Sequence, residues 1–168
     1  RIGADRRTVR EMLESQAVEA IRQRTDISRT AQEMLINARR GQGVYRSNLE
    51  NVEQECRITG VLDRRHLRAA HIKPWRECND AEKLDGFNGL LLSPHVEHLF
   101  EQGYISFSDD GTLLLSRWLN RVVLERWGIA QASQGRPFCA EQGVYLAWHR
   151  EQVFEQEEVG RRRLQKGE

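Results

Sequence analysis

The sequence predicts an α+β domain in which two short strands and a helix form a central unit, with helices before and after it in the chain and a small β-hairpin. Apolar residues recur at helical spacing near both ends, whereas short apolar runs and polar turns alternate in the middle. We expect three segments: a basic helical flank over residues 1–54, the central unit with its hairpin over 55–116, and a helical segment with a basic tail over 117–168. A chain of 168 residues is long enough for one domain with a real core.

Three helices are expected in the N-terminal segment. Apolar positions at helical spacing predict an amphipathic helix over residues 8–24. Asp26 or Ser28 can cap the second helix, which residues 41–43, a Gly-Gln-Gly sequence, bring to an end. A third helix is expected over residues 44–53.

After residue 54 the sequence pattern changes from helical spacing to the short apolar runs that are typical of strands. Residues 56–60 and 67–72 are predicted to pair as a hairpin, and residues 76–86 form a polar loop that is too charged for a strand. Residues 90–92 are a short buried run. The Ser-Pro pair that follows is typical of a helix start, and this helix is expected to end near Gly103.

A second hairpin and two further helices complete the chain. Residues 104–107 and 112–115 flank an Asp-Gly turn, which is typical of a tight hairpin. Helices are expected around residues 118–127 and 141–155, and the basic tail from Gly160 is expected to be frayed.

The net charge of +1 conceals an asymmetry between the two halves of the chain. Residues 1–76 carry 16 Lys/Arg and 10 Asp/Glu, a net charge of +6, and residues 77–168 carry 10 and 15, a net charge of −5. A basic front half suits a phosphate-rich partner, although solvated helix faces rich in Arg and Glu would give the same composition. No apolar run approaches the roughly 20 residues of a membrane span, and we expect no membrane association and no secretory signal.

The cysteines argue for a reducing compartment. Cys56, Cys78 and Cys139 are odd in number and far apart, and they form no C-x-x-C pair. This spacing argues against a disulfide framework and against a four-cysteine zinc site. We therefore expect reduced thiols in a cytoplasmic protein.

A histidine at a predicted strand end is the first candidate for chemistry. Hydrolysis of a phosphodiester needs a base to deprotonate water, a cation at the scissile phosphate, and groups that keep these aligned. His71 suits the base because the pKa of a histidine lies near neutrality, and Lys73 lies just beyond it. Asn88 could pin the loop or orient the imidazole. The alternatives are a structural histidine and an asparagine that merely forms a turn before Gly89.

The helix after the Ser-Pro pair carries the candidate metal ligands. Glu97 and Glu101 are four residues apart and share one face, as two ligands of a single ion should. His95 and His98 lie on a neighbouring face, where packing or phosphate contact is an equal alternative. The two glutamates could also be solvated helix acids.

The remaining aromatic residues and one histidine are expected to be structural. His149 is expected to pack near the C-terminal end of the fold. We expect the large aromatic side chains to lie in the core rather than to stack on bases: Trp75, Phe100, Trp118, Trp127 and Trp148.

Residues 56–110 resemble the HNH endonucleases, the ββα-metal (His-Me) finger nucleases. The resemblance is carried by C-x-[IV]-T-G from Cys56, A-x-H-I-K-P-W around His71, N-G-L-L-L-[ST]-P from Asn88, and LF[DE]-x-G-[YF]-I-S-F after it. Residues 39–46 also resemble the R-x-G-Q-G-x-[FY]-R lead-in of restriction-type members. The fold that this resemblance implies is a ββα-metal core with flanking helices.

The resemblance implies a role for each motif residue. His71 takes the place of the general base and Asn88 that of the central asparagine. Glu97 falls where the family places its helical metal ligand, and Glu101 lies one turn later, where colicin-type nucleases have another histidine.

One position departs from the family pattern. Many relatives carry a His or Asp ligand immediately before the base, where this chain has Ala70. The metal would then be held by fewer protein ligands with water and phosphate, or by another residue such as His98 or His66. Few, hard oxygen ligands favour Mg²⁺ or Mn²⁺, with Zn²⁺ or Ni²⁺ as alternatives.

DNA is the expected partner of this surface. Lys73 and Arg76 flank the base, and Arg39, Arg40 and Arg46 lie in the lead-in. The other candidate phosphate contacts are Arg57, Arg64, Arg65 and Arg68. The glycines of the lead-in would let backbone N–H groups approach a phosphate.

The sequence thus predicts a metal-dependent HNH endonuclease domain of a bacterial restriction or defence system, leaving a 5′-phosphate and a 3′-hydroxyl. The alternatives are a DNA-binding or regulatory module without a complete metal site and, less simply, a structural or interaction domain. No recognition helix is evident, so weak sequence specificity is expected. A homodimer, and a targeting domain upstream of Arg1, are further expectations.

Overall fold

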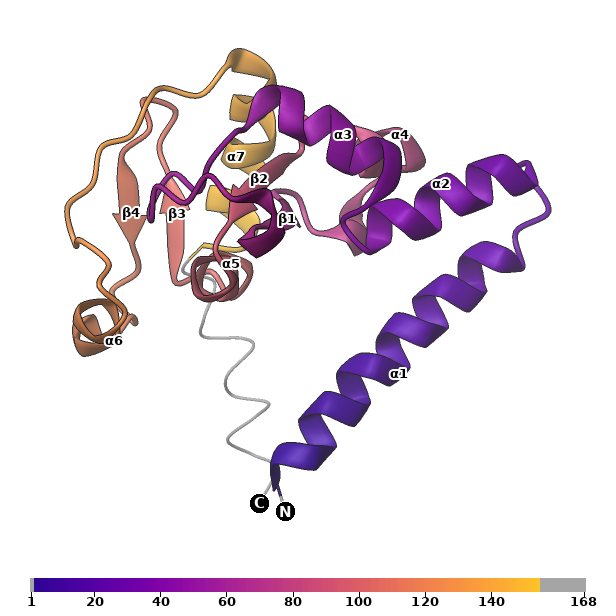
Figure 1. The fold of residues 1–168 in the computed structure, drawn as a ribbon, viewed down its shortest axis with the longest axis horizontal. Helices are drawn as coiled ribbons and strands as arrows, with labels where there is room; N and C mark the ends of the chain where they lie inside the picture. Colours follow the sequence, from indigo (N-terminus) through magenta and orange to yellow (C-terminus); the bar gives the residue numbers. More distant parts are fainter. Residues whose placement is uncertain (1, 155–168) are drawn as a thin grey trace.

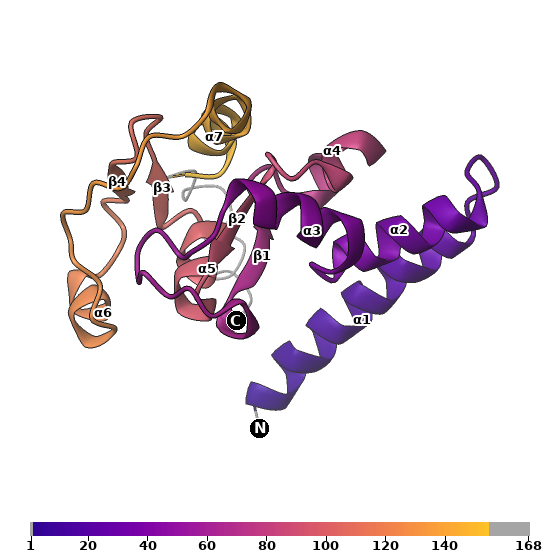
Figure 2. The same cartoon turned by 45° about the horizontal axis from the view of Figure 1, so that its top comes forward.

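The computed structural model describes residues 2–154, with side chains from residue 11 onward. Helices α1 (Ile2–Arg22) and α2 (Arg29–Arg39) form a hairpin that projects from the body, and α3 (Gly43–Val52) leads back into it (Figures 1 and 2). The second helix begins as predicted, because Ser28 Oγ accepts a hydrogen bond from the Ala31 N–H at 3.1 Å. The helix pair has its own small core, made of Val18, Ile21, Leu35 and Ile36.

The turn between α2 and α3 depends on glycine. Gly41 and Gly43 have φ values of +66° and +67°, a backbone region that favours glycine. A Cβ at Gly41 would also lie 3.2 Å from the Cβ of Ala69. The backbone of this turn therefore explains why glycine occupies both positions. The approach of their N–H groups to a phosphate stays a prediction.

The central unit consists of β1 (Arg68–His71), β2 (Gly89–Leu92) and α5 (Pro94–Glu101). The two strands pair antiparallel, with His71 opposite Gly89 and Ala70 opposite Leu90. They lie between α3 and α5 in both views (Figures 1 and 2). This order is compatible with the predicted strand–strand–helix core.

One predicted pairing is wrong. Residues 56–60 are not a strand, because Gly60 N–H donates to the Cys56 carbonyl at 2.8 Å and closes a turn. The partner of β1 is β2, whose four residues are all buried. The predicted polar loop between them contains two short helices, η2 (Trp75–Glu77) and α4 (Asp80–Leu84). Another short helix, η1 (Arg64–His66), precedes β1.

The second hairpin is confirmed by β3 (Ile105–Phe107) and β4 (Leu113–Leu115). Helices α6 (Arg121–Arg126) and α7 (Ala140–Gln152) follow, and α6 is shorter than predicted because Asn120 caps it by accepting from the Val122 N–H. The basic tail lies outside the described residues.

One core joins the three predicted segments. It includes Tyr45 and Leu49 of α3, the buried residues of β2 and α5, and Leu124 and Leu146 of the C-terminal helices. His149 is structural as expected, since it stacks on Phe100 with ring centroids 3.9 Å apart.

Two aromatic residues are not in the core. Trp118 and Trp127 are 43% and 42% exposed, because they flank α6 at the edge of the molecule (Figure 1). The expectation of burial was wrong for both. Phe100, by contrast, is buried.

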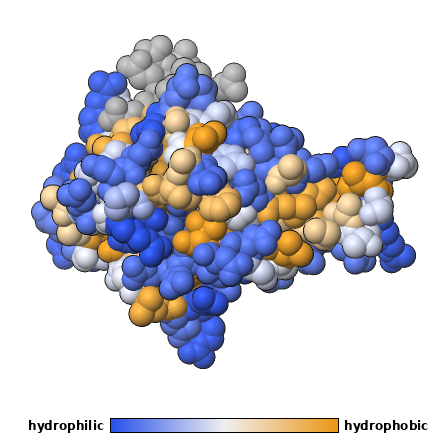
Figure 3. Space-filling view, turned by 90° about the horizontal axis from the view of Figure 1, so that it is seen from above, coloured by the Kyte–Doolittle hydropathy of each residue, from blue (hydrophilic) through white to orange (hydrophobic). Residues whose placement is uncertain are grey.

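The surface seen in Figure 3 is mostly hydrophilic, with apolar side chains in small patches. Within residues 2–154, no helix has both the length and the apolarity to cross a membrane. Cys56, Cys78 and Cys139 are all free thiols, as predicted.

Candidate functional site

His71 ends β1 in an aromatic setting. Its imidazole stacks on the ring of Tyr45, with centroids 4.0 Å apart and planes at 8°, and meets Trp75 edge-on at 5.5 Å. Gly89, opposite His71, makes room for this stack, because a Cβ there would lie 2.5 Å from the Tyr45 hydroxyl. Residues from three parts of the chain thus fix the position of one imidazole.

The hydrogen bonding of His71 defines its tautomer. Nε2 lies 3.0 Å from the Lys83 carbonyl oxygen. A carbonyl can only accept, so Nε2 carries the proton and Nδ1 of the neutral ring has a free lone pair for a proton. Burial lowers the pKa of His71 to about 4, and the nearby charges of Arg39 and Lys83 act in the same direction. The ring is therefore neutral at physiological pH, which is the state that a base requires.

Asn88 holds the loop that supplies this carbonyl. Its side chain is fully buried, and Oδ1 accepts a hydrogen bond from the Lys73 N–H at 2.9 Å. Nδ2 donates to the Glu82 carbonyl at 3.0 Å and to the Cys78 sulfur at 3.3 Å. Of the two predicted uses of this amide, the contacts favour pinning the loop.

Two cations gather at Trp75, beside His71. The Lys83 Nζ lies 4.9 Å from the ring centroid and the Arg39 Cζ lies 5.6 Å from it. Among the described residues, the Arg39 Nε is buried without a hydrogen-bond partner, although another nitrogen of the guanidinium meets Glu14 at 3.1 Å. The Lys83 Nζ also meets Asp80 at 3.5 Å, so each of the two cations beside the candidate base has a carboxylate partner.

The sequence indicates no role for Lys83, and Tyr45 enters only as the aromatic position of the lead-in motif, without a link to His71. Tyr45 lies 26 positions before His71, and no local pattern links the two. No role was predicted for Lys83 because residues 76–86 were expected to form a loop. A signal did exist: Asn79 and Glu82 form a capping box, and an N-x-x-E sequence predicts a helix start.

Glu97 lies in the first turn of α5, near Tyr45. Burial raises the pKa of the Tyr45 hydroxyl well above its usual value, and the carboxylate of Glu97 contributes to that rise. The same hydroxyl donates to the Asn88 carbonyl oxygen at 3.3 Å. Tyr45 thus contacts both the His71 ring and the Asn88 backbone.

The other proposed ligands lie further along α5. Glu101 and His98 are exposed, and His98 meets the ring of Trp127 edge-on at 6.5 Å, as His95 does at 5.6 Å. Ala70 is only 2% exposed and packs in the core.

No group of three or more His, Cys, Asp or Glu side chains that could hold a metal ion occurs among residues with described side chains. A structural Zn²⁺ site needs four such ligands. Mg²⁺ needs only one or two carboxylates, because it keeps several waters and binds substrate phosphate. Glu97 and Glu101 of α5 remain the candidate carboxylate ligands of a divalent ion.

The side chains predicted to contact DNA differ in how many hydrogen bonds and ion pairs they form within the protein. Arg46 donates to Glu50 at 2.7 Å and to the carbonyls of Leu67 and Arg64 at 3.0 and 2.8 Å, a structural set of bonds. The Lys73 Nζ pairs with Glu82 at 2.9 Å.

The other three contacts lie closer to solvent or to the base. Arg76 has a side chain that is 85% exposed, with Glu77 at 3.4 Å. Arg40 is exposed, and Arg39 lies beside Trp75. Binding of DNA by any of the five stays a prediction.

Residues 56–108 match the family model described as HNH endonuclease. This match confirms the resemblance to the HNH endonuclease family found in the sequence motifs of this segment. No curated protein matches the chain. The matched segment contains β1, β2, α5 and β3, with His71, Asn88 and Glu97, whereas Tyr45 and Arg39 lie outside it.

Proposed function

We propose that this protein is a metal-dependent HNH endonuclease that hydrolyses DNA phosphodiester bonds. One observation carries the proposal: a neutral His71, oriented by the Lys83 carbonyl and flanked by cations, lies inside the segment that matches the nuclease family. This is the arrangement that a base beside a phosphate requires.

In this proposal each residue has a separate task. His71 Nδ1 takes a proton from the attacking water, and the phosphate that lies beside it stabilises the resulting imidazolium. Arg39 and Lys83 attract the phosphate, since they are the cations nearest to Trp75. Asn88 keeps the loop, and hence the Lys83 carbonyl, in register.

A divalent cation, Mg²⁺ or Mn²⁺, would be held by Glu97, with Glu101 or His98 as further candidates. When bound, it supplies positive charge that stabilises the scissile phosphate and the leaving oxygen. Ala70 offers no ligand, so water and phosphate oxygens would complete the shell.

Plasmid nicking tests the function directly. The wild-type protein is expected to nick plasmid in Mg²⁺ or Mn²⁺ and to be inactive in EDTA. His71→Ala is expected to be inactive in every buffer while still binding DNA. Full nicking by this variant would contradict the assignment of the base.

A second candidate function is a DNA-binding or regulatory module without catalysis. The buried Ala70 favours it, because the ligand position before the base is lost to the core. Binding of DNA without metal-dependent nicking in any buffer would support this alternative.

We further propose a cytoplasmic restriction or defence role, because residues 39–46 resemble the lead-in of restriction-type members. A homodimer would allow both strands to be cut with one site per chain, and an upstream domain would supply targeting.

A further inference from the structure

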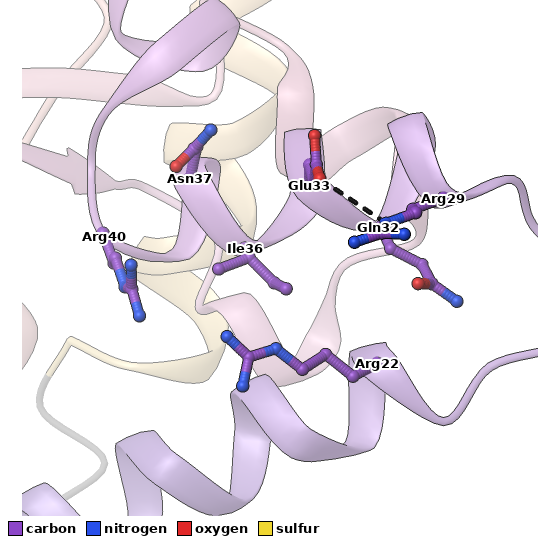
Figure 4. Close-up of a pocket in the computed structure, with 7 residues that line it drawn as sticks. All are labelled: Arg22, Arg29, Gln32, Glu33, Ile36, Asn37 and Arg40. Atoms are coloured by element: carbon purple, nitrogen blue, oxygen red, sulfur yellow. Dashed lines mark ion pairs between the residues drawn. The ribbon is translucent and has the colours of Figure 1, made fainter.

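We propose that the cleft between α1 and α2 binds the phosphate backbone of DNA beyond the family segment. The cleft has a volume of about 520 Å³ and is lined by Arg22 of α1, by Arg29, Glu33 and Ile36 of α2, and by Arg40 just after α2, among others (Figure 4). The inference rests on the proposed function, because it assigns part of the same substrate to a second surface.

The charges of this cleft are available to a ligand. Within the described side chains, no ion pair forms on Arg22 or Arg40, and Arg29 meets Glu33 only at 3.9 Å with both side chains largely exposed. Other arginines of the front half are paired more closely, Arg24 with Asp26 at 2.6 Å for example. Three guanidinium groups and one carboxylate leave a net positive cleft.

The floor of the cleft is packed into the core of the helix pair. Ile36 is 8% exposed and belongs to the small core shared by α1 and α2. Arg24 also ties the turn between the two helices to α4, through Asp80 at 2.7 Å. Figure 4 shows the Arg22 side chain reaching from α1 toward α2, near Ile36. Guanidinium groups on such a fixed frame are well suited to phosphate.

The position of the cleft favours nucleic acid over an acidic protein. Arg39, at the end of α2, lies beside Trp75 and the candidate base, and Arg40 is the next residue. From Arg40 to Arg29 the helix extends about 16 Å, which spans about five nucleotides of one strand. A duplex held at His71 therefore has a second basic surface along the same helix.

The test is DNA binding in EDTA, where no cleavage occurs, measured by fluorescence anisotropy on a duplex of about 24 base pairs at several salt concentrations. Arg22→Gln with Arg40→Gln is expected to lower the affinity roughly tenfold and to reduce the salt slope by about 2. The matched control, Arg117→Gln with Arg126→Gln, removes the same charge before α6 and at its last residue, and is expected to change the affinity less than about twofold.

If the cleft variant binds DNA as tightly as the wild type, the cleft proposal is overturned. It is also overturned if the cleft variant and the control variant lose the same DNA affinity, because that result would mean a general effect of charge. Plasmid nicking in Mg²⁺ is measured in parallel. Nicking by the wild type with an unaffected cleft variant would reject the cleft alone, whereas absence of nicking by the wild type would reject the proposed function.

Discussion

His71 acquires its chemical state from neighbours rather than from its own side chain. The Lys83 carbonyl assigns the proton to Nε2, and burial lowers the pKa to about 4. The motif indicated which histidine to choose. It could not indicate the tautomer, because the Tyr45 ring and the Lys83 carbonyl come from segments that sequence patterns do not connect with His71.

The pH dependence of cleavage follows from this pKa. Because the pKa is lowered from 6.5 to about 4, His71 stays neutral at mildly acidic pH and is protonated only below about pH 4. We expect kcat/KM for a duplex substrate, which reports the free enzyme, to keep its value through pH 6.5 and to fall toward pH 4. Circular dichroism at each pH checks that the fold persists. An acid limb centred at pH 6.5 would contradict the burial of the base.

At the scale of elements, the loop from η2 to α4 is the part of the fold that positions the site. The second hairpin was predicted from its Asp-Gly turn, whereas this segment was predicted to be a loop, although the capping box of α4 indicates a helix start. The pairing of β1 with β2 was not predicted, because 16 residues lie between His71 and Asn88 and the pattern favoured the nearer segment 56–60. Capping and turn motifs thus predict structure within a few residues, but they do not predict which distant strand pairs with β1.

Asn88 is predicted to matter through this loop. Asn88→Ala leaves the Lys73 N–H and the Glu82 carbonyl without their partner, at a cost on the order of 3 kcal/mol in the free energy of unfolding. Asn88→Asp keeps the acceptor for the Lys73 N–H but sets a carboxylate against the Glu82 carbonyl in a fully buried site, and it is expected to lose at least as much. Urea denaturation of the three proteins measures the order, and an Asn88→Ala variant as stable as the wild type would contradict it.

Gly89 is predicted to be irreplaceable for a different reason. In Gly89→Ala the new Cβ would lie 2.5 Å from the Tyr45 hydroxyl, so Tyr45 must shift and the stack on His71 must change. We expect a loss of about 1–3 kcal/mol in stability together with slower cleavage. The matched control is Gly60→Ala, where no atom lies within 4 Å of the new Cβ, although its φ of +70° adds some strain. Equal cleavage rates for Gly89→Ala and the wild type would argue against a role for the stack.

At the scale of the whole molecule, the family segment contains only part of the core into which it packs. Tyr45, Leu49 and Leu146 pack into the same cluster as the strands and α5, but they lie outside residues 56–108. The basic front half that composition revealed is partly used within the fold, by Arg46 and Arg57, for example. Composition could reveal the charge but not which arginines stay available.

A truncation tests this dependence. The isolated segment 56–108 is expected to be unfolded, because it lacks the side chains that cover one side of β1 and β2. A fragment of residues 11–154 is expected to fold. Circular dichroism and the dispersion of amide signals in nuclear magnetic resonance spectra distinguish the two, and a folded 56–108 segment would contradict the shared core.

The measurement that bears most directly on the central claim is the single-turnover cleavage rate of His71→Ala in Mg²⁺, compared with that of the wild type at equal DNA saturation. The proposal predicts a rate about 10² to 10⁴ times lower, with DNA affinity changed little, because a general base contributes to the transition state alone. A rate within about threefold of the wild type, at unchanged affinity, would contradict the assignment of His71 as the base.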